Sequence, residues 1–125
     1  MADLKEKAIA LLSTTTVSFA ANAQTTLYTV PAGKRCILSS ATIVLGADAV
    51  GTDVAIGQNG ATTDFITTTD LGNIDAQYDA AILQPIPATN VLKSKSYAAG
   101  TVIEINVTNQ AGSAGNTVYL YGTIY

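Results

Sequence analysis

The feature that most constrains the fold is a series of short strand-like runs separated by turn residues, which begins at residue 14 and continues to the C-terminus. β-Branched and aromatic residues concentrate in the runs, and Gly, Pro and Asn residues lie between them. No helical pattern interrupts the series, which predicts an all-β antiparallel sandwich of jelly-roll type. The expected strands are residues 14–19, 26–30, 35–45, 52–57, 64–68, 81–84, 91–93, 101–109 and 117–125.

Three of these runs indicate which side chains form the core. Ile103, Ile105 and Val107 alternate with more polar residues, which predicts a strand with one buried face. The last run also alternates, with Val118 and Leu120 on the expected core side. Residues 35–45 are apolar on both faces, which is typical of a central or covered strand. Residues 14–125 are therefore expected to form a single domain.

The first thirteen residues have a different pattern, and we expect them to form a helical arm. Asp3 and Glu6 have the spacing of a capping box, and the apolar residues that follow fall along one helical face. Three turns are marginal in water, so this helix needs a surface to pack on. That surface is either the chain's own domain or a neighbouring subunit or protein. In the second case the expected partner contacts are Leu4, Ile9 and Leu12.

The composition offers little material for catalysis. The chain has no His, so the commonest general base and metal ligand are both missing. Its single Cys36 cannot form an intramolecular disulfide and is expected to be a buried, inert thiol. The pattern favours a protein that is not an enzyme and that has no catalytic residues, no cofactor and no metal.

Two groups of acidic residues were candidates for chemistry. Asp70, Asn73, Asp75 and Asp79 gather oxygen ligands of the kind that calcium prefers, but a solvated polar loop explains their spacing better. Asp64, Asp70 and Glu104 could supply a carboxylate pair for glycoside cleavage, yet their spacing does not favour a pair over separate surface positions.

The shortage of charge also narrows the range of partners. Only 12% of the residues are charged and the net charge is −3, whereas nucleic-acid binding needs a stripe of Lys and Arg. No apolar run approaches the roughly eighteen residues that would span a bilayer. A neutral surface rich in Ala and Thr suits a protein that packs against other protein, since no charges must then be desolvated. We expect protein partners, and no binding to nucleic acid or membrane.

The last strand carries a row of tyrosines, Tyr119, Tyr121 and Tyr125, on the face opposite its apolar residues. Tyrosine combines a large contact area with a hydroxyl group and is enriched where proteins meet. The same residues could instead form a cross-strand aromatic ladder inside one subunit. Both interpretations follow from the sequence, and the first makes these tyrosines expected partner contacts.

Residues 26–34 carry a short motif in which a strand ends in Val30-Pro31-Ala32-Gly33-Lys34, and a long apolar strand follows at once. Pro31 fixes φ and Gly33 permits a positive φ, so the motif predicts a tight reversal. A later Ala99-Gly100 turn leads into the alternating strand 101–109, and the chain closes on its last strand. In these elements the sequence resembles small β-sandwich accessory proteins of tailed bacteriophage particles.

The resemblance implies a jelly-roll-like subunit that is usually trimeric and that either decorates the capsid as a cement protein or sits in tails and fibres. On this basis we expect a structural virion protein, made in the host cytoplasm and located on the surface of the phage head. Its partners would be copies of itself, as a homotrimer, and the major capsid protein, whose capsomers it would bridge. The alternative is a tail or fibre module that binds a host receptor or glycan.

Overall fold

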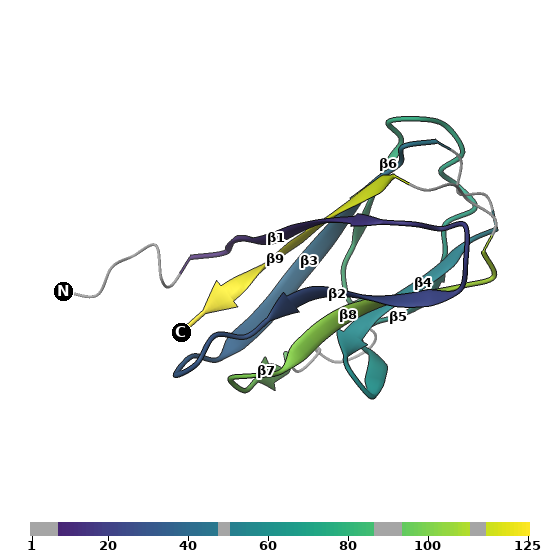
Figure 1. Ribbon diagram of the computed structural model, residues 1–125. Helices are drawn as coiled ribbons and strands as arrows, with labels where there is room; N and C mark the ends of the chain where they lie inside the picture. Colours follow the sequence, from purple (N-terminus) through teal and green to yellow (C-terminus); the bar gives the residue numbers. More distant parts are fainter. Residues whose placement is uncertain (1–7, 48–50, 87–93, 111–114) are drawn as a thin grey trace.

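The computed structural model describes residues 8–47, 51–86, 94–110 and 115–125, within which nine strands and no helix are found (Figure 1). The strands are β1 (Ala10–Val17), β2 (Ala23–Thr29), β3 (Cys36–Val44), β4 (Asp53–Gln58), β5 (Ala61–Asp70), β6 (Ala80–Leu83), β7 (Ser96–Tyr97), β8 (Val102–Thr108) and β9 (Asn116–Ile124).

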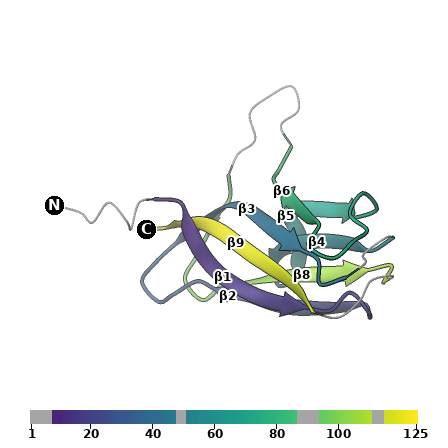
Figure 2. The same cartoon turned by 90° about the horizontal axis from the view of Figure 1, so that it is seen from above.

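The strands form two antiparallel sheets that pack face to face as a β-sandwich (Figures 1 and 2). The five-stranded sheet has the order β1-β9-β3-β6, with β7 also paired to β3, and the four-stranded sheet has the order β2-β8-β4-β5. Strands that are neighbours in a sheet mostly lie far apart in the sequence. The last strand, β9, pairs with β1 on one side and with β3 on the other. The first and last strands of the chain are therefore neighbours in one sheet.

The core lies between the sheets and takes large side chains from both. Ile43, Val118 and Leu120 from the five-stranded sheet are fully buried, as are Ile103 and Ile105 from the four-stranded sheet. The alternation expected in the strands that became β8 and β9 is therefore confirmed. Burial of each such side chain stabilises the fold by about 1.5–3 kcal/mol, which is why alternate residues of these strands face inward.

The expected central strand is also confirmed, because β3 pairs with β9 on one side and with β6 and β7 on the other. The two residues of β7 were not expected as a strand. Its Ser96 and Tyr97 pair with Ile37 and Cys36. A two-residue bridge leaves no periodic pattern in the sequence, so tertiary pairing alone defines it. The strand expected at residues 91–93 lies outside the described residues.

The prediction of an N-terminal helix is wrong for residues 8–13. Ala8 and Ile9 are not helical, and Ala10 begins β1, which pairs with β9 and crosses the expected boundary between residues 13 and 14. The physical reason is that the edge of β9 offers backbone partners and an apolar surface, which outweigh a weak local helical preference. A Cβ atom at Gly122 would lie 2.9 Å from Leu12 Cδ1, so this leucine packs over Gly122 at the rim of the core.

Candidate interaction surface

The outer face of the five-stranded sheet is free of charge, and we call it the uncharged face. Strands β1, β3, β6, β7 and β9 contain no Asp, Glu, Lys or Arg. Their registers place Thr14, Tyr119, Thr42 and Ile82 in one row across four strands. A second row contains Leu11, Tyr121 and Ser40. Because Val118 and Leu120 face the core, these alternate residues face outward.

Exposed apolar side chains gather on this sheet and next to it. Among the described residues, the large hydrophobic side chains that are exposed lie at the start of β1, in β6 or just beside it, and after β9. They are Ile9, Leu11, Tyr78, Ile82, Ile86 and Tyr125. The four-stranded sheet contributes none of them. Exposed apolar groups concentrated on one side of a protein mark a surface that contacts another molecule.

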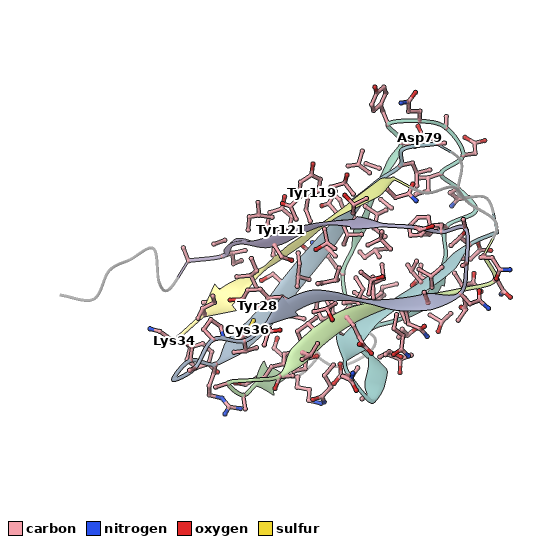
Figure 3. All side chains as sticks on the ribbon, in the orientation of Figure 1. Tyr28, Lys34, Cys36, Asp79, Tyr119 and Tyr121 are labelled. Atoms are coloured by element: carbon pink, nitrogen blue, oxygen red, sulfur yellow. The ribbon has the colours of Figure 1, made fainter. Side chains whose placement is uncertain are left out.

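Tyr119 and Tyr121 lie on the uncharged face, on the side of β9 away from the four-stranded sheet (Figure 3). Both side chains are half-buried. The residues directly opposite Tyr119 are Thr14 and Thr42, and those opposite Tyr121 are Leu11 and Ser40. Neither tyrosine therefore has an aromatic partner directly across the sheet, as a ladder within one subunit would require.

Tyr125 has a different role from the other two tyrosines. Its hydroxyl group lies 2.7 Å from Ser96 Oγ, and its backbone pairs with Arg35. Arg35 donates from Nε to the same Ser96 Oγ at 2.8 Å and from Nη2 to the Ser96 carbonyl oxygen at 3.0 Å. Tyr125 thus ties the C-terminus to β7 while its side chain stays partly exposed.

The structure separates the three expected contacts of the N-terminal arm. Ile9 projects into solvent with 67% of its surface exposed. Leu12 packs against its own core, as described above. Leu4 lies outside the described residues. Sequence reasoning did not identify Leu11 and Ile82 as exposed apolar residues, although the strand period would have placed Leu11 outward if residues 10–13 had been assigned to a strand.

Asp64 of β5 joins the two sheets through its bond to Tyr97 of β7. The carboxylate accepts hydrogen bonds from Gln58 N and Nε2, from Lys95 Nζ at 2.7 Å and from Tyr97 Oη at 2.8 Å. Burial alone would raise the pKa of Asp64, but the hydrogen bonds from Lys95, Tyr97 and Gln58 outweigh it and hold the pKa below its usual value. Burial raises the pKa of Tyr97, and its bond to Asp64 adds to this.

A groove of about 770 Å³ lies beside this bridge, between β5 and the edge of β3 and β7. Ile37, Phe65 and Ile86 are among its apolar lining residues. Its charged lining residues are Asp64 and Lys95, which neutralise each other. Among the described residues that line the groove, these two charged groups form one ion pair.

Two carboxylates of the candidate calcium cluster, those of Asp70 and Asp79, accept hydrogen bonds from backbone N–H groups of their own loop. Asp79 Oδ2 accepts hydrogen bonds from the backbone N–H groups of Asp75 and Ala76, each at 3.1 Å, and Asp70 Oδ1 accepts from Gly72 N at 2.8 Å. Within the described residues no group of three or more His, Cys, Asp or Glu side chains could hold a metal ion. These carboxylates stabilise the turns of residues 70–79.

Cys36 is fully buried at the start of β3. Burial raises the pKa of its thiol to about 11, so the reactive thiolate is scarce near neutral pH. The thiol therefore acts as a small core side chain, as the sequence suggested.

The two motifs behind the family resemblance lie side by side. Gly33 has a φ of 73°, and Lys34 N donates to the Pro31 carbonyl at 3.2 Å, so the expected tight reversal is present. Gly100 has a φ of 82° and donates to the Val30 carbonyl at 2.8 Å, while Val30 N donates to the Thr101 carbonyl at 3.0 Å. The Pro-Ala-Gly and Ala-Gly turns thus form one end of the sandwich.

No family model matches this chain, and neither the curated proteins nor the solved structures yield a significant match. In the part of the chain that the structure describes, no helix has the length and apolar character needed to cross a membrane.

Proposed function

We propose that this chain is a structural protein of a bacteriophage particle, a jelly-roll-like capsid decoration subunit. It binds the assembled head as a homotrimer and stabilises the shell by bridging capsomers. The observation that carries the proposal is the uncharged face, with Tyr119 and Tyr121 at its centre and exposed apolar residues along its margins. A face of this kind loses no ion hydration when protein covers it.

The mechanism requires no chemistry. A subunit that binds the intact shell more tightly than the broken one shifts the equilibrium toward the intact shell by mass action. Rotational symmetry lets several weak contacts act together, so that the trimer binds more tightly than one subunit. The protein acts on the surface of the head, after synthesis in the host cytoplasm, and its partners are its own copies and the major capsid protein. It acts without a cofactor or metal and binds neither nucleic acid nor membrane.

The two paired turns support the same proposal. In the accessory proteins that the sequence resembles, a Val-Pro-Ala-Gly-Lys turn leads into a long apolar strand. Here this turn leads directly into β3, the strand that lies at the middle of the five-stranded sheet. The motif therefore sets the start of β3, the strand with which β6, β7 and β9 of this sheet pair.

The experiment is binding to mature phage heads that lack the protein, followed by measurement of the temperature at which they release DNA. Wild-type protein should sediment with the heads and raise that temperature. Tyr119→Lys with Tyr121→Lys should abolish both effects. The matched control is Gln24→Lys with Thr26→Lys, which adds the same charge to exposed positions of β2 in the other sheet and should behave as wild type.

The outcomes separate the two functions. Wild-type protein that fails to bind heads contradicts the decoration proposal, and binding to host cells instead supports the tail or fibre alternative. Equal loss of head binding in both double variants would place the contact elsewhere than on the uncharged face. Circular dichroism of each variant checks that the fold is retained.

A further inference from the structure

The side-chain charges that the structure describes are divided between the two ends of the sandwich. Lys34 and Arg35 follow the Pro-Ala-Gly turn, and Lys95 precedes β7, which pairs with the start of β3. We call the end that holds these three cations the basic end. Asp64 forms an ion pair with Lys95 and Glu104 is buried, whereas Lys34 and Arg35 meet no carboxylate within ion-pair distance among the described residues.

The opposite end, which we call the acidic end, carries negative charge. Four carboxylates lie at the start of β4, at the end of β5 and in the loop that leads to β6, and they are Asp53, Asp70, Asp75 and Asp79. Figure 3 shows Asp79 and Lys34 at opposite ends of the molecule. No Lys or Arg lies at the acidic end among the described residues. The segments 48–50 and 111–114, which join described residues at this end, contain none in the sequence.

The acidic end also presents a tyrosine outside the core. The Tyr78 ring is 77% exposed, and its backbone φ of 71° is unfavourable for a bulky residue. Tyr78 N donates to the Leu45 carbonyl at 2.9 Å, and Asp79 N donates to the Ala76 carbonyl at 3.0 Å, so the loop holds this conformation. A ring held in this position near carboxylates suits contact with a cationic side chain, because the face of an aromatic ring attracts cations.

We propose that copies of this chain associate end to end, with the acidic end of one copy on the basic end of the next. A second copy is the partner that the charges favour, because each copy carries both complementary surfaces. Lys34 and Arg35 of one copy would approach the carboxylates and the Tyr78 ring of its neighbour. The exposed turn residues Pro31 and Ala32 have small side chains and permit this approach.

The contact is separate from the one in the proposed function. Its two sides are different surfaces, so it is heterologous and can repeat along a row of copies. The uncharged face lies on one side of the sandwich, whereas the charged residues lie at its ends, so the end-to-end contact leaves that face uncovered. Head binding and end-to-end association can therefore fail independently.

Sedimentation velocity at low and high salt is the first test. Exposed charges interact over about 30 Å at 0.01 M salt but over only about 3 Å at 1 M. Wild-type protein should therefore form heavier species at low salt than at high salt. A mass that does not change with salt, at protein concentrations up to about 1 mM, where even weak contacts associate, overturns the proposal.

Charge reversal at each end is the second test. Lys34→Glu and Asp75→Lys should each weaken association at low salt by about tenfold, because each replaces an attraction by a repulsion. A mixture of the two variants should recover association. The intact acidic end of the first fits the intact basic end of the second, and the two reversed ends also have opposite charges. A mixture that associates no better than either variant alone contradicts the end-to-end contact.

Matched controls place the same changes of charge along the strands. Thr26→Lys with Thr67→Lys adds the same charge as Asp75→Lys, and Thr26→Glu with Thr67→Glu matches Lys34→Glu. Both positions are exposed in strands of the four-stranded sheet, and both controls should associate as wild type does. Equal weakening in the controls would mean that net charge alone governs association, which overturns the proposal.

Tyr78→Asn tests the ring without changing any charge. Asn tolerates a positive φ better than most residues do, so the loop should keep its conformation, and circular dichroism checks that the fold is retained. Loss of the ring should weaken association at low salt by about two- to fivefold. Unchanged association would remove the ring from the contact and overturn the proposed arrangement of the two ends.

Discussion

The two sheets share one core but differ on their outer faces. Strands of the five-stranded sheet have no charged residue, whereas those of the four-stranded sheet contain Asp53, Asp64, Asp70 and Glu104, all acidic. Folding requires only that the inner faces be apolar, and both inner faces meet this requirement. The difference is one of strand composition, because Asp64 bonds to Tyr97 of the other sheet and Glu104 is buried, while in our proposal the uncharged strands present a face that protein covers.

The largest expected effect is the loss of stability when a core side chain is removed, and it tests whether both sheets depend on the same core. Leu120→Ala in β9 and Ile105→Ala in β8 each remove a fully buried side chain and should each lower the free energy of unfolding by about 2–5 kcal/mol. Urea unfolding followed by circular dichroism measures both losses. A large loss for one variant and a negligible one for the other would mean that one sheet folds without the other.

The next effect concerns the bridge between the sheets. Asp64→Asn removes the ion pair with Lys95 and weakens the bond from Tyr97, and should cost about 1–3 kcal/mol near pH 7. Asp75→Asn, at an exposed position of the 70–79 loop, should cost less than about 0.5 kcal/mol.

The contribution of Asp64 should also depend on pH. Its folded pKa lies below the unfolded value of 3.8, so the contribution is complete above the unfolded pKa and is lost as the pH falls through the folded pKa. Wild type and Asp64→Asn should therefore converge in stability in acid. A difference that stays constant from neutral pH to about pH 2 would contradict this assignment of the low pKa.

A smaller effect, of opposite sign, is expected at Glu104. This side chain is buried on β8, with Oε2 3.5 Å from Asn59 Nδ2, and Oε1 has no hydrogen-bond partner among the described residues. Glu104→Met replaces a poorly paired carboxylate with an apolar group of similar length, and should raise the free energy of unfolding by about 1 kcal/mol. A decrease in the urea midpoint would show that this acidic residue is needed for folding.

The smallest effect on folding is expected on the uncharged face itself. Thr14→Lys adds a charge at an exposed position of β1, and should change the stability of the separated subunit by less than about 0.5 kcal/mol. Unfolding at low protein concentration measures the subunit without its partners. A loss above about 1 kcal/mol would mean that folding, and not association, keeps this face free of charge.

Some features of the fold could be predicted from the sequence, and others could not. The alternation of Ile103, Ile105 and Val107 identified β8 and its buried face, because a strand with one side in a core repeats every two residues. The turn at Pro31 and Gly33 was also predictable, since it depends on the local preferences of φ. The outward position of Tyr119 and Tyr121 followed from the same period of two.

Other features depended on contacts between distant residues. The helix expected before residue 14 has a reasonable local pattern, but Ala10–Val17 gains more from pairing with β9 than from helical hydrogen bonds. The two residues of β7 pair with residues of β3 about sixty positions away, and the bridge from Asp64 to Lys95 and Tyr97 joins positions about thirty apart. The spacing of these residues contains no sign that they meet.

The sequence by itself determined that the chain is built of strands, which residues of β8 and β9 face the core, and how the chain turns at Gly33. These properties depend on local backbone geometry and on the period of apolar residues. Only the tertiary structure decided which strands share a sheet, and therefore that every charge in the strands falls on the same sheet. Strand order comes from the packing of distant segments, so the uncharged face exists only in the folded chain.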